Sequence, residues 1–143
     1  MVHVLETGLE FIDIENPNGK PAVRGYNIIN GELTLASDGA TFTSTNPALL
    51  ADCVGEFPLS TRDDVHSALH AAHAAFPAWA ATPAPTRGQI IGNMGRLLME
   101  HKDALVALET REIGKTLKES GGEIQEAIDT CLFFQSEGRR LYG

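Results

Sequence analysis

The fold of this chain is decided by residues 60–79, which read Ser-Thr-Arg-Asp-Asp-Val-His-Ser-Ala-Leu-His-Ala-Ala-His-Ala-Ala-Phe-Pro-Ala-Trp. Here the spacing of apolar side chains changes from every second residue to about every 3.6 residues, which marks the change from strands to helices. Ser60 and Thr61 each have an aspartate three residues later, a pattern that resembles an N-cap with an acidic first turn. We therefore expect a helix over residues 61–75 that ends at Pro77.

The residues before this segment carry short groups of β-forming residues separated by turn residues. Asn30-Gly31 supplies the two positive-φ positions of a type I′ turn, so we expect strands at about 26–29 and 32–36. Further turns and short extended segments are expected at 37–39, 41–44, 46–47 and 53–57.

Three more helical patterns follow the first one. The second helix has an apolar stripe made of Ile90, Ile91, Met94, Leu97 and Leu98. Gly92 and Gly95 lie inside this helix and each cost about 1 kcal/mol relative to Ala, so they indicate close backbone packing against a neighbour. The third helix is expected to end near Gly114, in the position of a C′ glycine. The fourth has its apolar residues at Ile124, Ala127, Ile128, Cys131 and Leu132.

Composition indicates a soluble globular chain. The 143 residues are 43% hydrophobic and have a net charge of −8, with no basic cluster beyond Arg139-Arg140, which argues against nucleic acid or an anionic membrane as partner. The chain has no apolar run long enough to span a membrane, and its first residues lack the pattern of a secretory signal. We therefore expect a cytoplasmic protein in which Cys53 and Cys131 are reduced.

The histidines His66, His70 and His73 form the one metal-like pattern of the sequence. On a helix they fall within an arc of about 60°, so a zinc site is geometrically possible. No acid or cysteine completes a tetrahedral ligand set, however, and a single helix rarely supplies three ligands. We expect a solvated helix face and assign no metal ligand.

Gly114-Lys115-Thr116 resembles the end of a phosphate-binding loop, but position 109, where that loop needs a glycine, is Glu109. The glycines at 88, 92 and 95 do not form a dinucleotide fingerprint either. No cofactor-binding residue is therefore assigned.

The other reactive or aromatic side chains have structural interpretations. Cys131 lies on an apolar stripe and Cys53 has no cationic neighbour in sequence, so neither is assigned as a nucleophile. No catalytic residue is assigned. Phe76 and Trp79 are expected to form an aromatic plug between the first two helices. Glu112 and Lys115, three positions apart, are expected to form an exposed pair.

Several landmarks follow one another along the chain: Asn46-Pro47, Ala-Ala-Phe76-Pro77-Ala-Trp79, Arg87, Glu112-Ile-Gly114-Lys115 and the closing Leu141-Tyr142-Gly143. In order and spacing they resemble the amino-terminal part of the aldehyde dehydrogenase superfamily, over residues 26–143. Glu123-Ile-Gln-Glu126 is similar to the aminoadipate-semialdehyde dehydrogenase-like branch.

The resemblance implies part of the α/β fold of aldehyde dehydrogenases, with an N-terminal β-hairpin and short strands followed by about four α-helices. By the same resemblance, we expect the nucleotide-binding sheet of that fold to be absent from this chain. The expected division is an irregular extension over 1–25, the hairpin and short strands over 26–59, and an incomplete helical part of the cofactor domain over 60–143.

The resemblance also implies NAD(P)-dependent oxidation of an aldehyde or semialdehyde to a carboxylate, through a cysteine thiohemiacetal and hydride transfer. The family's nucleophilic cysteine, base glutamate, oxyanion asparagine and cofactor-binding lysine lie beyond residue 143, and Cys131 lacks the Gly-Gln-x-Cys context of the nucleophile. We expect this chain alone to be an inactive N-terminal fragment that binds neither NAD nor NADP.

Without the nucleotide-binding sheet, the apolar stripes of the second and fourth helices have no partner, so we expect association with a second copy or with a full-length relative. The alternative is a non-catalytic self-association or interaction module derived from that family.

Overall fold

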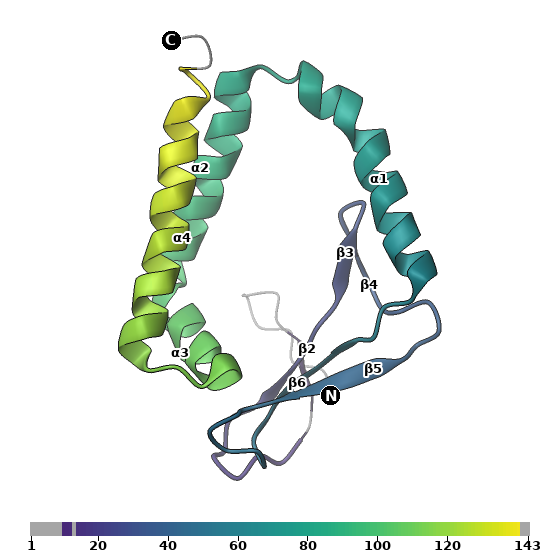
Figure 1. The fold of residues 1–143 in the computed structure, drawn as a ribbon, viewed down its shortest axis with the longest axis vertical. Helices are drawn as coiled ribbons and strands as arrows, with labels where there is room; N and C mark the ends of the chain where they lie inside the picture. The colour runs from purple at the N-terminus through teal and green to yellow at the C-terminus, as the bar shows by residue number, and fades with distance from the viewer. Residues whose placement is uncertain (1–9, 13, 141–143) are drawn as a thin grey trace. The chain divides into compact units, whose positions relative to one another are not determined.

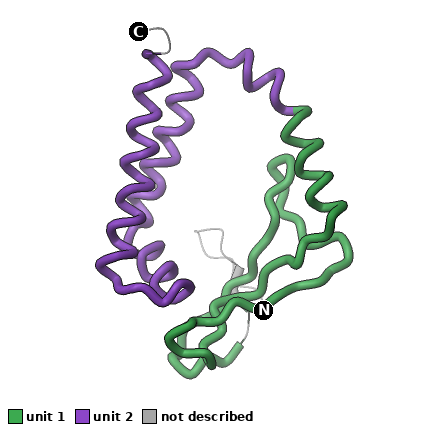
Figure 2. Tube along the Cα trace, viewed as in Figure 1, with its two compact units in different colours: residues 1–74 green, residues 75–143 purple. Residues whose placement is uncertain are grey.

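The computed structural model describes residues 10–12 and 14–140 (Figure 1). The chain divides into two compact units, residues 1–74 and residues 75–143 (Figure 2). The first unit contains the strands and the start of the first helix, and the second contains the remaining helices. This order of strands followed by helices confirms the change of period that the sequence shows near residue 60.

A four-stranded sheet with the order β1-β2-β6-β5 forms the centre of the first unit. Its strands are β1 (Glu10–Ile12), β2 (Ala22–Arg24), β5 (Thr41–Thr45) and β6 (Cys53–Pro58). β2 pairs with β6 in parallel, while β1 with β2 and β5 with β6 are antiparallel. Its buried apolar side chains include Ala22, Val23 and Val54, so the core of this unit lies along the β2–β6 pair.

The expectation of an irregular segment over residues 1–25 is wrong for β1 and β2. A strand of three residues is too short to show an alternating pattern in the sequence. The position of β2 is instead determined by its pairing with β6, in which Val23 lies opposite Gly55 and Arg24 opposite Glu56. A sequence reading that uses local periodicity does not detect such a pairing.

The predicted hairpin is present as β3 (Asn27–Ile29) and β4 (Glu32–Thr34). Asn30 has a φ of 54° and Gly31 a φ of 79°, as a type I′ turn requires. The predicted extended segments at 41–44 and 53–57 are confirmed by β5 and β6.

The Asn46-Pro47 turn that ends β5 is fixed by polar side chains. Ala48 N donates to Asn46 Oδ1 at 2.9 Å, which makes the turn an Asx turn. The fully buried carboxylate of Asp52 accepts hydrogen bonds from Asn46 Nδ2 at 3.1 Å and Asn18 Nδ2 at 2.7 Å. These bonds compensate for the burial of a charged group and attach the loop before β2 to the start of β6.

Helix α1 (Arg62–Ala81) begins at the predicted cap. Thr61 N donates to Asp64 Oδ2 at 2.7 Å, and Asp64 N donates to Thr61 Oγ1 at 3.3 Å. Ser37 N also donates to Asp64 Oδ1 at 3.1 Å, so the same carboxylate holds the β4–β5 loop against the helix. These hydrogen bonds, led by the one from the Thr61 backbone, lower the pKa of Asp64.

The prediction that α1 ends at Pro77 is wrong, because the helix contains Pro77 and continues to Ala81. A proline removes one backbone hydrogen bond, but the alanines on either side have the highest helix propensity and the helix is retained. Thr82 N bonds to Ala78 O at 3.1 Å, and Pro83 then disfavours helical geometry at the residue before it.

The second unit consists of the end of α1 together with α2 (Ala84–Glu100), α3 (Lys102–Ile113) and α4 (Leu117–Glu137). α2 and α4 lie side by side along their length (Figure 1). Gly114 has a φ of 77° and ends α3, which confirms the predicted C-terminal glycine. α3 and α4 are joined by a hydrogen bond of 3.0 Å between Thr110 Oγ1 and the buried Ser120 Oγ.

Candidate functional site

The α2–α4 interface is built on glycines. Gly88, Gly92 and Gly95 are buried and lie on one face of α2, at the i, i+4, i+7 spacing. A Cβ atom on Gly88 would lie 2.6 Å from Gln135 O, and one on Gly95 would lie 2.8 Å from Cys131 Cβ. The expectation that glycines in the second helix permit close packing is therefore confirmed.

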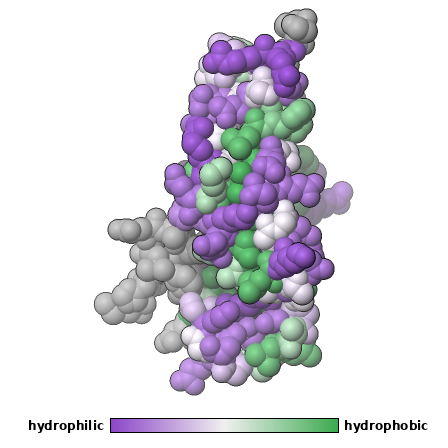
Figure 3. Space-filling view, turned by 90° about the vertical axis from the view of Figure 1, so that its left-hand side faces the viewer, coloured by the Kyte–Doolittle hydropathy of each residue, from purple (hydrophilic) through white to green (hydrophobic). Residues whose placement is uncertain are grey.

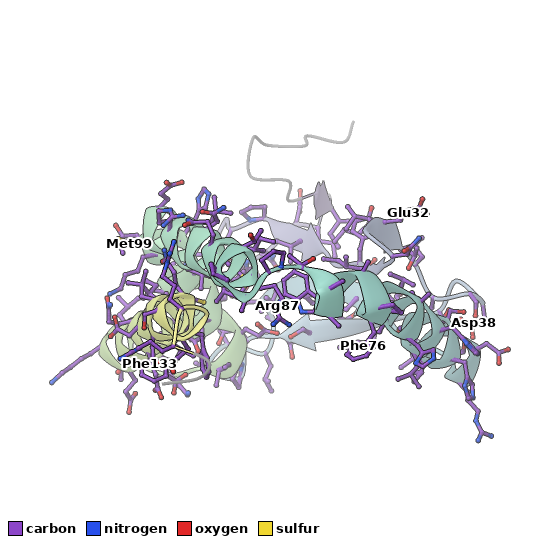
Figure 4. The ribbon with its side chains drawn as sticks, turned by 90° about the horizontal axis from the view of Figure 1, so that it is seen from above. Glu32, Asp38, Phe76, Arg87, Met99 and Phe133 are labelled. Carbon is purple, nitrogen blue, oxygen red and sulfur yellow. The ribbon has the colours of Figure 1, made fainter. Side chains whose placement is uncertain are left out.

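The apolar stripe of α2 is only partly covered at this interface. Ile90, Met94 and Leu97 are exposed, whereas the buried residues of α2 are glycines. α4 differs, because Ile128 and Cys131 of its predicted apolar stripe are buried, while Phe133 and Phe134 beside them are exposed. In Figure 4, Phe133 projects from α4 on the side away from α2. The helical unit thus leaves many of its large apolar side chains uncovered.

An open groove of about 520 Å³ lies between α2 and α4. Its lining is mostly apolar and comprises Trp79, Ala84, Arg87, Gly88, Ile91, Met94, Thr130, Cys131, Phe134, Glu137 and Gly138. The space-filling view of the chain from the side of α4 shows hydrophobic residues in a broken line, with hydrophilic residues on both sides (Figure 3). A groove of this kind suits a binding surface better than a catalytic centre.

Arg87 brings a positive charge to this groove from the first turns of α2 (Figure 4). Its Nε atom is buried and has no hydrogen-bond partner among the described residues. The acid that lines the groove, Glu137, is already paired, with Glu137 Oε1 lying 2.6 Å from Arg140 Nη2. The sequence identified Arg87 as a landmark but gave it no role. The groove itself could have been anticipated only from the spacing of the glycines, which indicates close packing of α2 on a neighbouring helix.

The predicted aromatic plug is wrong for Phe76, which is 64% exposed. Because α1 continues through Pro77, Phe76 lies on the helix surface rather than after its end. Trp79 is 42% exposed and does lie beside α2, where it lines the groove. The expectation therefore holds only for Trp79.

Gly114-Lys115-Thr116 forms a helix-to-helix turn and not a phosphate loop. Thr116 caps α4 by accepting from Glu119 N at 3.3 Å, and Thr116 N donates to Glu119 Oε2 at 3.1 Å, which completes a capping box. These groups are occupied by each other, so the described residues here do not fit the phosphates of NAD or NADP. We derive no cofactor chemistry for them.

Lys115 pairs with Glu123 of α4, and the predicted pair with Glu112 is not the observed one. Gly114 ends α3 between residues 112 and 115, so the helical geometry that would bring them together is lost. The hydrogen bond from Lys115 is the main cause of the lowered pKa of Glu123, and the same bond raises the pKa of Lys115.

Glu109 lies beside this pair. Its Oε2 atom is buried with no hydrogen-bond partner among the described residues. Burial, followed by a hydrogen bond and the like charge of Glu123, raises the pKa of Glu109. Glu109, Lys115 and Glu123 thus form a charged cluster that connects the end of α3 to α4.

The three histidines of α1 are all exposed on the helix surface. Among residues 10–12 and 14–140, no group of three or more His, Cys, Asp or Glu side chains is arranged to hold a metal ion. Cys131 is buried against α2, as expected, and Cys53 is half-buried at the start of β6. In the same ranges no helix is both long and apolar enough to cross a membrane.

Comparisons with known sequences agree with this architecture. The profile of the "Aldehyde dehydrogenase family" matches residues 34–143. The NADP(+) succinate-semialdehyde dehydrogenase GabD of Escherichia coli is 40% identical over 126 residues, which are 88% of this chain and 26% of that protein. An alpha-ketoglutarate semialdehyde dehydrogenase of Haloferax volcanii is 39% identical over 117 residues, 82% of this chain and 24% of that protein.

Solved structures agree as well. An NADP-dependent enzyme of E. coli superposes with a TM-score of 0.79 at 41% identity, over 83% of this chain and 24% of that chain. The NAD-dependent aldehyde dehydrogenase from Sinorhizobium meliloti gives a TM-score of 0.78 at 26% identity, over 85% of this chain and 24% of that one. The chain thus spans about a quarter of the length of the relatives it matches. Since most of its residues match the family profile, the chain belongs to the aldehyde dehydrogenase family.

Proposed function

We propose that this chain is the amino-terminal, non-catalytic part of an NAD(P)-dependent dehydrogenase that oxidises a semialdehyde to a carboxylate. The family match supports the reaction, and the names of the relatives, which act on succinate and alpha-ketoglutarate semialdehydes, support the substrate class. The observation that carries the proposal is the exposure of large apolar side chains on α2 and α4, which is typical of a part that packs against more protein.

In this proposal the chain supports the enzyme without contributing reacting groups. The candidate phosphate loop is occupied by its own capping box, and both cysteines have structural positions. NAD or NADP would be held by residues that these 143 do not include. We place the working protein in the cytoplasm, since Cys131 is a buried free thiol, which reducing compartments maintain.

The purified chain, incubated with succinate semialdehyde and either NAD or NADP, tests the proposal by absorbance of the reduced cofactor. We expect no aldehyde-dependent NADH or NADPH formation and no quenching of Trp79 fluorescence by either cofactor. Aldehyde-dependent NADH formation by the chain alone would overturn the proposal.

A second candidate function is a non-catalytic module that associates with itself or with a full-length relative. It is favoured by the β3–β4 hairpin, on which Ile28 and Leu33 are 74% and 61% exposed and lie opposite each other. Sedimentation distinguishes the two functions. Stable dimers or tetramers of the chain alone favour the module, whereas recruitment of the chain only by the rest of an aldehyde dehydrogenase favours the enzyme part.

A further inference from the structure

We propose that Asn30 is a site of spontaneous deamidation and that its isoaspartate product disrupts the β3–β4 hairpin (Figure 1). Asn18 and Asn30 are the asparagines that a glycine follows. Such pairs react readily, because glycine has no Cβ atom to hinder the attacking backbone nitrogen. The structure exposes the reacting groups of one pair and restrains those of the other. This modification takes place within the chain and is independent of the proposed dehydrogenase function.

The reaction is a cyclisation followed by hydrolysis. The backbone nitrogen of Gly31 loses its proton to a base in the solvent and forms a bond to Cγ of Asn30, while the bond from Cγ to the side-chain amide nitrogen breaks. That nitrogen takes up a proton and leaves as ammonia. Water then opens the five-membered succinimide ring. Cleavage at Cγ gives aspartate, whereas cleavage at the main-chain carbonyl gives isoaspartate, in which the backbone runs through the side-chain carbons.

Asn30 and Gly31 are both exposed in the turn between β3 and β4. In the described part of the chain, no hydrogen bond holds the side-chain amide of Asn30, and the backbone N–H of Gly31 makes no turn hydrogen bond. Cyclisation requires the turn to leave its native dihedral angles. A two-stranded sheet with three residues in each strand is marginally stable by itself, so we expect local opening of this turn.

Asn18 is also exposed, but each of its reacting groups is held by a hydrogen bond. Asn18 Nδ2 donates to the buried carboxylate of Asp52 at 2.7 Å, and Asn18 Oδ1 accepts from Lys20 N at 3.0 Å. Gly19 N, which is the attacking atom of this pair, donates to Asn16 O at 2.9 Å. These bonds must break before the ring can close, so we expect reaction about tenfold or more slower than in the hairpin.

Isoaspartate at position 30 adds a carbon atom to the backbone of a two-residue turn. The type I′ turn sets the register in which Ile29 lies opposite Glu32 and Ile28 opposite Leu33. Because the extra carbon changes the length of the turn, this pairing is lost. Aspartate on a normal backbone retains the pairing, since Asp-Gly also forms a type I′ turn. Deamidation through isoaspartate therefore converts the hairpin into an irregular loop.

The first test compares the two asparagines within one chain. The native 143-residue chain is incubated at pH 8, and a second sample is incubated in the same buffer with denaturing urea. Peptide mapping by mass spectrometry follows the deamidated fraction of Asn18 and of Asn30 with time. We expect deamidation of Asn30 to be about tenfold or more faster than that of Asn18 in the native chain, and the two rates to become similar in urea.

Equal rates in the native chain, or faster reaction at Asn18, would overturn the proposal. A difference that persists in urea would overturn it as well, because the neighbouring sequence rather than the fold would then set the rates.

The second test examines the effect on the hairpin. The isoaspartate form is separated by chromatography, and cross-strand contacts between Ile28 and Leu33 are measured by NMR. We expect these contacts to be absent from the isoaspartate form. Asn30→Asp is the matched control, because it adds the same charge on a normal backbone and should keep them. Contacts that remain in the isoaspartate form, or that are lost in Asn30→Asp, would contradict disruption by the longer backbone.

Discussion

At the scale of single residues, Glu109 shows how a carboxylate can weaken the native state at neutral pH. Its pKa is raised by burial and by Glu123, so the native state favours the protonated form more than the unfolded state does. The stability that Glu109 contributes is therefore fully present at low pH, below its unfolded pKa, and is lost as the pH rises through the raised value.

We predict that Glu109→Gln raises the melting temperature at pH 7 and has little effect at pH 4, because glutamine resembles the protonated acid. Melting curves between pH 4 and pH 8, followed by circular dichroism, check this. Glu126→Gln, at an exposed position of α4, is the control and should leave the melting temperature unchanged at both pH 4 and pH 7. A lower melting temperature for Glu109→Gln at pH 7 would show that the charged form stabilises the fold.

Thr116 is the second residue with a measurable role, as the N-cap of α4. Replacement by alanine removes the acceptor for Glu119 N, and loss of such a cap typically costs about 1 kcal/mol. We predict that Thr116→Ala lowers the melting temperature by about 3 °C. Thr116→Ser keeps the hydroxyl and should melt like the original chain, so equal melting of the two variants would contradict the cap's contribution.

At the scale of elements, the contact between α2 and α4 depends on backbones that approach closely. A methyl group on Gly88 would meet the carbonyl oxygen of Gln135, which cannot move without displacing α4. We predict that Gly88→Ala destabilises the chain by about 1–3 kcal/mol despite the better helix propensity of alanine. Chemical denaturation gives the change in free energy of unfolding.

Gly121 is the matched control, because a Cβ atom there would have nothing within 4 Å. Gly121→Ala should stabilise α4 by up to about 1 kcal/mol, which is the helix propensity term alone. Opposite signs for the two substitutions support glycine-mediated packing. Stabilisation by both would mean that α2 and α4 do not approach each other as described.

Elements whose signals are local could be predicted from the sequence. Asn30-Gly31 determines the hairpin, Thr61 with Asp64 starts α1, and Gly114 ends α3, each through contacts within a few residues. β2 could not be predicted, since its order comes from pairing with β6. The end of α1 was misjudged because the helix propensity of the surrounding alanines outweighs the cost of Pro77.

The groove between α2 and α4 could not be predicted from the sequence either, for a physical reason. An apolar stripe normally marks the face of a helix that is buried, and on that basis the α2 stripe should face its neighbour. In α2 the glycine face is the one that packs on α4, and Ile90, Met94 and Leu97 of the stripe are left exposed. Arg87 could be recognised as a landmark, but that its Nε atom has no acceptor among the described residues follows only from the three-dimensional arrangement.

At the scale of the whole molecule, the central claim is that this chain works as a part of a larger dehydrogenase. Under the proposed function, the exposed apolar side chains of its helices and the groove between α2 and α4 would face the remainder, which would hold the reacting groups and the cofactor. The family match and the coverage of about a quarter of each relative agree with such a division of roles.

The most direct test is semialdehyde-dependent NADPH formation by this chain co-expressed with the part of E. coli GabD that follows the matched segment. The account predicts turnover of succinate semialdehyde by the co-purified pair and none by either polypeptide alone. A co-purified pair that forms no NADPH with succinate, glutarate or malonate semialdehyde, or turnover by this chain alone, would contradict it.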